Sequence, residues 1–103
     1  MDYGIILRAT NPLDRTGSRK VLILGGNHGF GTESAIQFIT DLANCSALSD
    51  AVGEHDFELL FDASVGRNRG LKLGILRLGL WEDGKWLPLN SKQLHTLRNK
   101  CRG

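Results

Sequence analysis

The chain has 103 residues, of which 41% are hydrophobic and 23% are charged, with a formal net charge of +2 at pH 7; these values are typical of one globular domain over residues 1–103. No apolar run approaches the roughly 20 residues of a membrane helix, and the first residues do not resemble a secretory signal, so we expect a cytoplasmic protein with no membrane partner. The two cysteines lie at positions 45 and 101, a spacing that excludes a disulfide framework and gives no metal site.

Two strands are expected before the first glycine cluster. Residues 3–9 form the first, and a loop over residues 11–19 follows, because the residue before Pro12 is pushed out of helical conformations. The second strand, residues 20–24, is apolar throughout after Lys20. Its continuous rather than alternating hydrophobicity indicates burial on both faces, as in the middle of a sheet.

A helix and a third strand follow. Apolar residues recur at helical spacing from about residue 32 to residue 44, and residues 57–65 form the third strand candidate. The strand, turn, helix and strand over residues 20–65 predict a Rossmann-like unit, whose two strands run parallel through a right-handed crossover.

The remaining strands predict antiparallel pairing. In residues 71–80 the apolar face switches parity, which indicates burial on both sides or a bulge near Gly74. The Asp-Gly pair at residues 83–84 is a hairpin signal that places Trp81 opposite Trp86. Pro88 confines the returning strand to an edge of the sheet, because proline cannot donate a hydrogen bond to a second neighbour.

The predicted fold class is α/β. It is a small mixed sheet of about five strands that contains one Rossmann-like strand-turn-helix-strand unit, with flanking antiparallel hairpins. A short C-terminal helix begins after Asn90 or Ser91. If that helix leaves one sheet face open, the face needs a partner, so we expect a homo-oligomer or a partner protein.

The glycine-rich turn after the second strand is the clearest indication of function. The apolar strand ends at a double glycine, two more glycines follow, and a helix-like pattern then begins. That order presents backbone N–H groups and the positive end of a helix to an anion. The residues of this candidate ligand site are Gly25, Gly26, Asn27, His28, Gly29, Gly31 and Thr32.

Residues 21–36 resemble the cofactor turn of the short-chain dehydrogenase/reductase family, in which Thr-Gly-x-x-x-Gly-x-Gly holds the pyrophosphate of a nicotinamide dinucleotide. Gly25, Gly29 and Gly31 match the family's three glycines, and Leu24 stands in place of its threonine. The family's catalytic Tyr-x-x-x-Lys has no counterpart in this chain. The resemblance therefore implies a binding turn without dehydrogenase activity, and it leaves the ligand unidentified.

The same segment matches half of a phosphate-binding P-loop. Gly26 and Gly31 have the required spacing, but Thr32 and Glu33 occupy the positions of the lysine and the serine or threonine. A carboxylate at Glu33 repels a triphosphate, which favours a neutral or singly charged ligand. Two alternatives remain open: the glycines serve only close packing of strand and helix, or the turn contacts another protein.

The basic second half of the chain gives a further alternative. Residues 1–65 carry four basic and nine acidic residues, whereas residues 66–103 carry nine basic and two acidic ones. Such asymmetry is typical of a polyanion-binding half, or of two halves that pair within the fold. The candidate basic surface consists of Arg67, Arg69, Lys72, Arg98 and Lys100.

Three hypotheses for the function follow. The first is a non-catalytic Rossmann-like module that binds a small ligand or a nucleotide-like anion at residues 25–32 and acts as a sensor or assembly domain. The second is a protein-interaction or oligomerisation module without a ligand, and the third is a nucleic-acid-binding module that uses residues 67–102. We assign no catalytic residue, because a general base at His28 needs a nucleophile or water beside it; Ser34 and Asp62 are the candidates for its partners.

Overall fold

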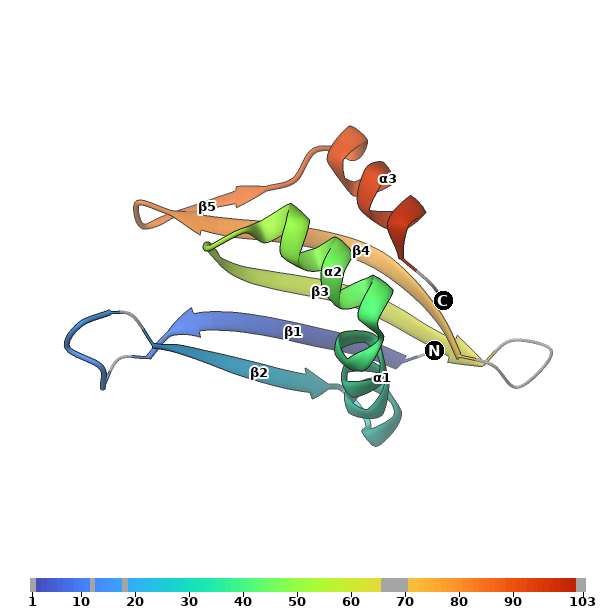
Figure 1. The fold of residues 1–103 in the computed structure, drawn as a ribbon. Coiled ribbons are helices and arrows are strands. Elements are labelled where there is room, and N and C mark those ends of the chain that lie inside the picture. The colour runs from blue at the N-terminus through green and yellow to red at the C-terminus, as the bar shows by residue number, and fades with distance from the viewer. Residues whose placement is uncertain (1, 12, 18, 66–70, 102–103) are drawn as a thin grey trace.

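The computed structural model describes residues 2–11, 13–17, 19–65 and 71–101. These parts of the chain form five strands and three helices (Figure 1). Their order is β1 (Asp2–Thr10), β2 (Lys20–Gly26), α1 (Gly29–Thr40), α2 (Leu42–Val52), β3 (Asp56–Val65), β4 (Leu71–Glu82), β5 (Lys85–Pro88) and α3 (Ser91–Lys100).

The five strands form one sheet in the order β2-β1-β3-β4-β5. This confirms the α/β class and the predicted number of strands. The sheet is antiparallel rather than mixed, because each of the four neighbouring pairs is antiparallel. Strands β2 and β3 do run in the same direction, but β1 lies between them and takes the position that a parallel crossover would need. The β1–β2 hairpin forms instead, since strands adjacent in the sequence usually pair with each other.

Strand β2 was expected in the middle of the sheet, and this prediction is wrong. It lies at an edge, and Val21, Leu22 and Ile23 are all exposed. A run of apolar residues indicates that both faces of a strand can be buried, but it does not show which other elements pack against those faces. The position of β2 is set by its pairing with β1, in which Ile6 lies opposite Leu24.

The helices gather on one face of the sheet. Helix α1 packs on the adjoining ends of β1 and β2, α3 packs on β4, and α2 contacts both of the other helices (Figure 1). One continuous core lies between the helices and this face of the sheet. Its buried side chains are Ile6, Ala35, Phe38, Ala47, Leu48, Val52, Phe57, Leu59, Phe61, Ala63, Ile75, Leu78 and Leu97.

The hairpin predicted in the C-terminal half of the chain is present in the structure. The β4–β5 hairpin turns at Asp83 and Gly84, both with positive φ, and the Trp81 and Trp86 rings lie opposite each other with centroids 5.4 Å apart. Of the two alternatives for residues 71–80, the structure has the bulge. The β3–β4 register shifts between Leu60 and Phe61, which leaves Leu76, two residues after Gly74, without a partner on β3.

The C-terminal helix α3 also begins as expected. The Asn90 side chain accepts a hydrogen bond from the Gln93 amide, and the Gln93 side chain accepts one from the Asn90 amide. This reciprocal pair is a capping box, which satisfies amides at the start of a helix that have no partner within it.

Candidate functional site

Two glycines of the predicted ligand turn are required by packing. A Cβ on Gly26 would lie 2.6 Å from the backbone of Gly31 and Thr32, and a Cβ on Gly31 would collide with the carbonyl oxygen of Tyr3. The end of β2, the first turn of α1 and the beginning of β1 therefore approach one another at backbone contact distance. This contact supports the packing alternative for these two positions.

Asn27 has a structural role as well. Its side-chain oxygen accepts a hydrogen bond from the Tyr3 amide at 2.8 Å, and its own amide donates to the Tyr3 carbonyl at 3.2 Å. The turn is thereby fixed to the first strand. An Asn27 side chain held in this way is engaged within the fold rather than free to bind a ligand.

The other residues of the turn are more accessible. Gly29 has no atom within 4 Å of the position that a Cβ would take, and Gly25 meets only one methyl group of Ile5. His28 is exposed, and its Nδ1 lies 3.2 Å from a carboxylate oxygen of Asp2. That carboxylate brings negative charge to the start of α1, which opposes a highly charged anion there. Thr32 is half-buried and donates its amide to the His28 carbonyl.

The two candidate partners for His28 lie elsewhere. The Ser34 hydroxyl is buried and donates to the Phe30 carbonyl at 2.7 Å. Asp62 pairs with Tyr3 and Gly74 on the sheet face opposite the helices. Neither residue forms a hydrogen bond with His28, so the structure does not assemble the proposed general-base arrangement from these three residues.

The predicted basic surface is only partly described. Arg67 and Arg69 lie outside the described residues, as does the side chain of Lys72. Arg98 donates from Nε and Nη2 to the Ile75 carbonyl at 2.9 and 2.6 Å, which attaches α3 to β4. Lys100 is exposed and borders a hollow between α2 and α3.

A polar network that the sequence did not reveal joins one end of the sheet to α2. The guanidinium of Arg8 donates from Nη2 to the Gly53 carbonyl at 2.6 Å and from Nε to the His55 carbonyl at 3.2 Å. It also lies 5.1 Å from the ring centroid of Phe57. Arg8 thus places a positive charge beside the C-terminal end of α2, where carbonyl groups lack helical partners.

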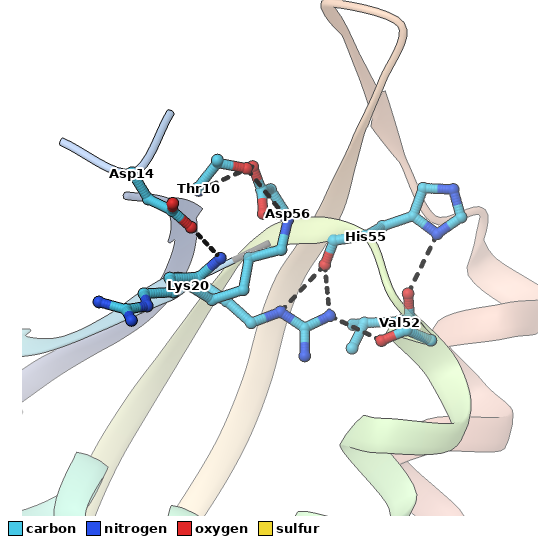
Figure 2. A network of polar contacts seen from close by, with 9 residues as sticks. Thr10, Asp14, Lys20, Val52, His55 and Asp56 are labelled. Carbon is cyan, nitrogen blue, oxygen red and sulfur yellow. Dashed lines mark hydrogen bonds and ion pairs between the residues drawn. The ribbon is translucent and has the colours of Figure 1, made fainter. Parts of the chain in front are cut away.

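Lys20 and Asp56 complete this network (Figure 2). The Lys20 Nζ lies 2.7 Å from a carboxylate oxygen of Asp56, whose other oxygen accepts hydrogen bonds from the amide and hydroxyl of Thr10. Burial raises the pKa of Asp56, but Lys20 and Thr10 together outweigh it and hold that pKa below 3.8. Because its groups pair with each other, the network ties strands together rather than presenting reactive groups.

Hollows flank the network on either side. One, of about 290 Å³, lies among β1, β2 and the first two helices, and the other, of about 360 Å³, lies beside the β4–β5 turn. The first is lined by Arg8, Lys20, Leu22, Ile39, Cys45, Leu48, Ser49, Val52 and Phe57. Among the described residues, no group of three or more His, Cys, Asp or Glu side chains could hold a metal ion.

The sheet face opposite the helices carries many apolar residues, and we call it the uncovered face. The register places Ile5 beside Leu60 and Leu7 beside Ile23 on this face. No described helix packs on it, and its side chains do not belong to the core. Its apolar residues are Tyr3, Ile5, Leu7, Val21, Ile23, Leu60, Trp81 and Trp86.

Comparison of the chain with protein-family models, with curated proteins and with solved structures found no match. The resemblance of residues 21–36 to a dinucleotide-binding turn therefore stays a prediction. None of the described helices is long and apolar enough to cross a membrane.

Proposed function

We propose that this chain is a non-catalytic protein-interaction module that packs a partner protein against its uncovered face. The single observation that carries the proposal is a sheet face rich in apolar residues, among them Tyr3, Ile23 and Trp81, on which no described helix packs. A sheet with apolar residues on both faces is stable in water when both are covered. Large exposed apolar patches of this kind are typical of protein-protein contacts.

Exposure of individual residues supports this reading. Tyr3 and Trp81 are each 44% exposed although both are large and apolar over most of their surface. Burying one such aromatic side chain in a partner stabilises the complex by roughly 1.5–3 kcal/mol before the costs of association. Aromatic residues are also enriched where interfaces derive most of their binding energy.

Charged residues on the same face provide specificity. Arg77 lies opposite Leu60, between the levels of Glu58 and Asp62 on the neighbouring strand. Within the described parts of the chain, these three charged side chains form no hydrogen bond or ion pair. They remain available to complementary charges on a partner, which would fix its orientation on the apolar surface.

Two substitutions on the same hairpin test the proposal. Trp81 and Leu87 are both 44% exposed, but Trp81 lies on the uncovered face and Leu87, opposite Leu80, lies on the helix face. We expect Trp81→Lys to reduce the recovery of the partner protein from cells of the source, and Leu87→Lys to retain it. Equal behaviour of two folded variants would contradict the assignment of the uncovered face.

A small ligand at residues 25–32 is a second proposal, favoured by one specific observation. The amides of Gly29 and Phe30, at the start of α1, donate to no acceptor within the described residues, and the His28 side chain does not cap the helix. Free amides at a helix N-terminus attract an anion. The nearby carboxylates of Asp2 and Glu33 favour a neutral or singly charged group over a polyphosphate.

A further inference from the structure

We propose that β2 of one copy pairs antiparallel with β2 of a second copy, so that two sheets join into one of ten strands across a two-fold axis. This surface is the free edge of the sheet with the adjoining helix α1. It shares Val21 and Ile23 with the uncovered face, but it pairs β2 side by side with another strand, whereas the proposed partner packs on top of that face. The inference rests on four observations about β2.

The first observation is the contrast between the two edges of the sheet. Strand β5 has four residues, and it contains Pro88 and the charged Lys85. Short strands, prolines and lysines are the usual features that prevent an edge from pairing with another chain. Strand β2 has seven residues, contains no proline, and carries its only charge at Lys20, its first residue. The β5 edge is therefore protected against pairing, and the β2 edge is not.

The second observation is that β2 has the sequence of an interior strand. Leu22 points to the helix face and Ile23 to the uncovered face, yet each is 48% exposed. A run of apolar residues on both sides of a strand is typical of strands with neighbours on both edges. Pairing with a second copy supplies the missing neighbour and covers part of both side chains.

The third observation is that β2 is suited to pairing with itself. An antiparallel register centred on Ile23 uses all seven residues and places Leu22 beside Leu24 of the partner subunit. Lys20 then lies beside Gly26 of the partner subunit, and the two lysines are about 20 Å apart at a rise of about 3.4 Å per residue. A parallel arrangement would instead place the two lysines next to each other.

The fourth observation concerns the helix layer above β2. Helix α1 begins just after Gly26 and leaves the Lys20 end open, where the hollow of about 290 Å³ contains Leu22 and Ile39. The two-fold axis brings α1 of the partner subunit beside this open end. Ile36, which is 47% exposed and three residues before Ile39, supplies an apolar side chain there. Contacts by α1 add to the area of a short strand pair, which alone falls below the approximately 800 Å² per partner of a stable dimer.

The test introduces charged residues at the centre of the proposed register, in the full chain, and measures dimer formation. Ile23 of each copy faces the same residue of the other, so Ile23→Lys and Ile23→Glu each place like charges together. We expect the wild-type chain to sediment as a dimer, each variant to raise the dissociation constant at least tenfold, and an equimolar mixture of the two variants to form a heterodimer. Circular dichroism must show that both variants remain folded.

The variant Leu22→Lys distinguishes pairing at the β2 edge from binding of a partner to the uncovered face. Leu22 lies on the helix face of β2, so it affects edge pairing but does not touch a partner on the uncovered face. If Leu22→Lys and Ile23→Lys both dissociate the dimer and Trp81→Lys does not, the edge is the interface. If Trp81→Lys alone dissociates it, the inference is wrong while the proposed function stands. The inference is also overturned if the wild-type chain stays monomeric at about 100 µM, a concentration well above the dissociation constants of stable dimers.

Discussion

The glycine-rich turn can be divided into structural and free positions by two alanine substitutions. In Gly31→Ala the new Cβ collides with the carbonyl oxygen of Tyr3 in β1. That oxygen already accepts a hydrogen bond from the Asn27 amide. Because the collision is with backbone, neither side can move without disturbing the contact between α1 and β1. In Gly29→Ala the new Cβ meets no atom within 4 Å.

The expected magnitudes have opposite signs. Overfilling a closely packed contact costs about 1–3 kcal/mol, and the collision with backbone places Gly31→Ala in the upper half of that range. The higher helix propensity of alanine returns up to about 1 kcal/mol, so Gly31→Ala should lose about 1–2 kcal/mol. Gly29→Ala has no such cost and should gain up to about 1 kcal/mol, because alanine reduces the freedom of the unfolded chain. A change of 1 kcal/mol corresponds to a shift of roughly 4–8 °C in Tm for a domain of about this size.

Thermal unfolding followed by circular dichroism measures both effects. The protein concentration must be the same in all samples, because association makes Tm depend on concentration. We expect Gly31→Ala to melt several degrees below the wild type and Gly29→Ala at or above it. If Gly31→Ala is as stable as the wild type, the backbone contact does not constrain this position, and the assignment of the glycine to packing is wrong.

Three further predictions concern the turn, the polar network and the cysteines. If residues 25–32 bind a small anion, inorganic phosphate should raise the Tm of the wild type but not that of Gly29→Val; no rise in the wild type contradicts anion binding at the turn. The pKa of Asp56 is lowered overall, so its ion pair stabilises the fold above pH 3.8 and is lost as the pH falls further. Lys20→Met should therefore cost up to about 1 kcal/mol at pH 7 and almost nothing near pH 2 in urea titrations, whereas equal losses contradict the pairing. Burial, aided by a nearby carboxylate, raises the pKa of Cys101 above 9.0, and Cys45 is exposed, so iodoacetamide at pH 8 should modify Cys45 first by mass spectrometry; equal rates would refute this.

The sequence predicted best what neighbouring residues determine among themselves. The Asp-Gly turn fixed the pairing of Trp81 with Trp86, and Asn90 with Gln93 fixed the start of α3. Both depend on a few residues with defined backbone preferences, and no distant part of the chain alters them. The fold class followed from the sum of such local preferences.

Features that depend on distant residues could not be predicted in the same way. The apolar run of β2 is compatible with the centre or the edge of a sheet, and only its pairing with β1 decides between them. Arg8 appears in the sequence as one charge within an apolar strand, and its partners, Gly53 and His55, lie more than 40 positions later. No local sequence pattern indicates that an arginine in a strand contacts the end of a helix, because that contact depends on how the whole chain folds.

The glycine turn and the exposed edge of β2 have a common structural cause. Close contact of Gly26 with Gly31 turns the chain directly from the strand into α1, which therefore packs over the ends of β1 and β2 nearest the turn. The same contact leaves the Lys20 end of β2 without a helix, next to the hollow that contains Leu22. A tight turn thus fixes the helix and at the same time leaves an apolar strand edge open. Substitutions at Gly26 or Gly31 should consequently weaken both folding and association, whereas Ile23→Lys should weaken association alone.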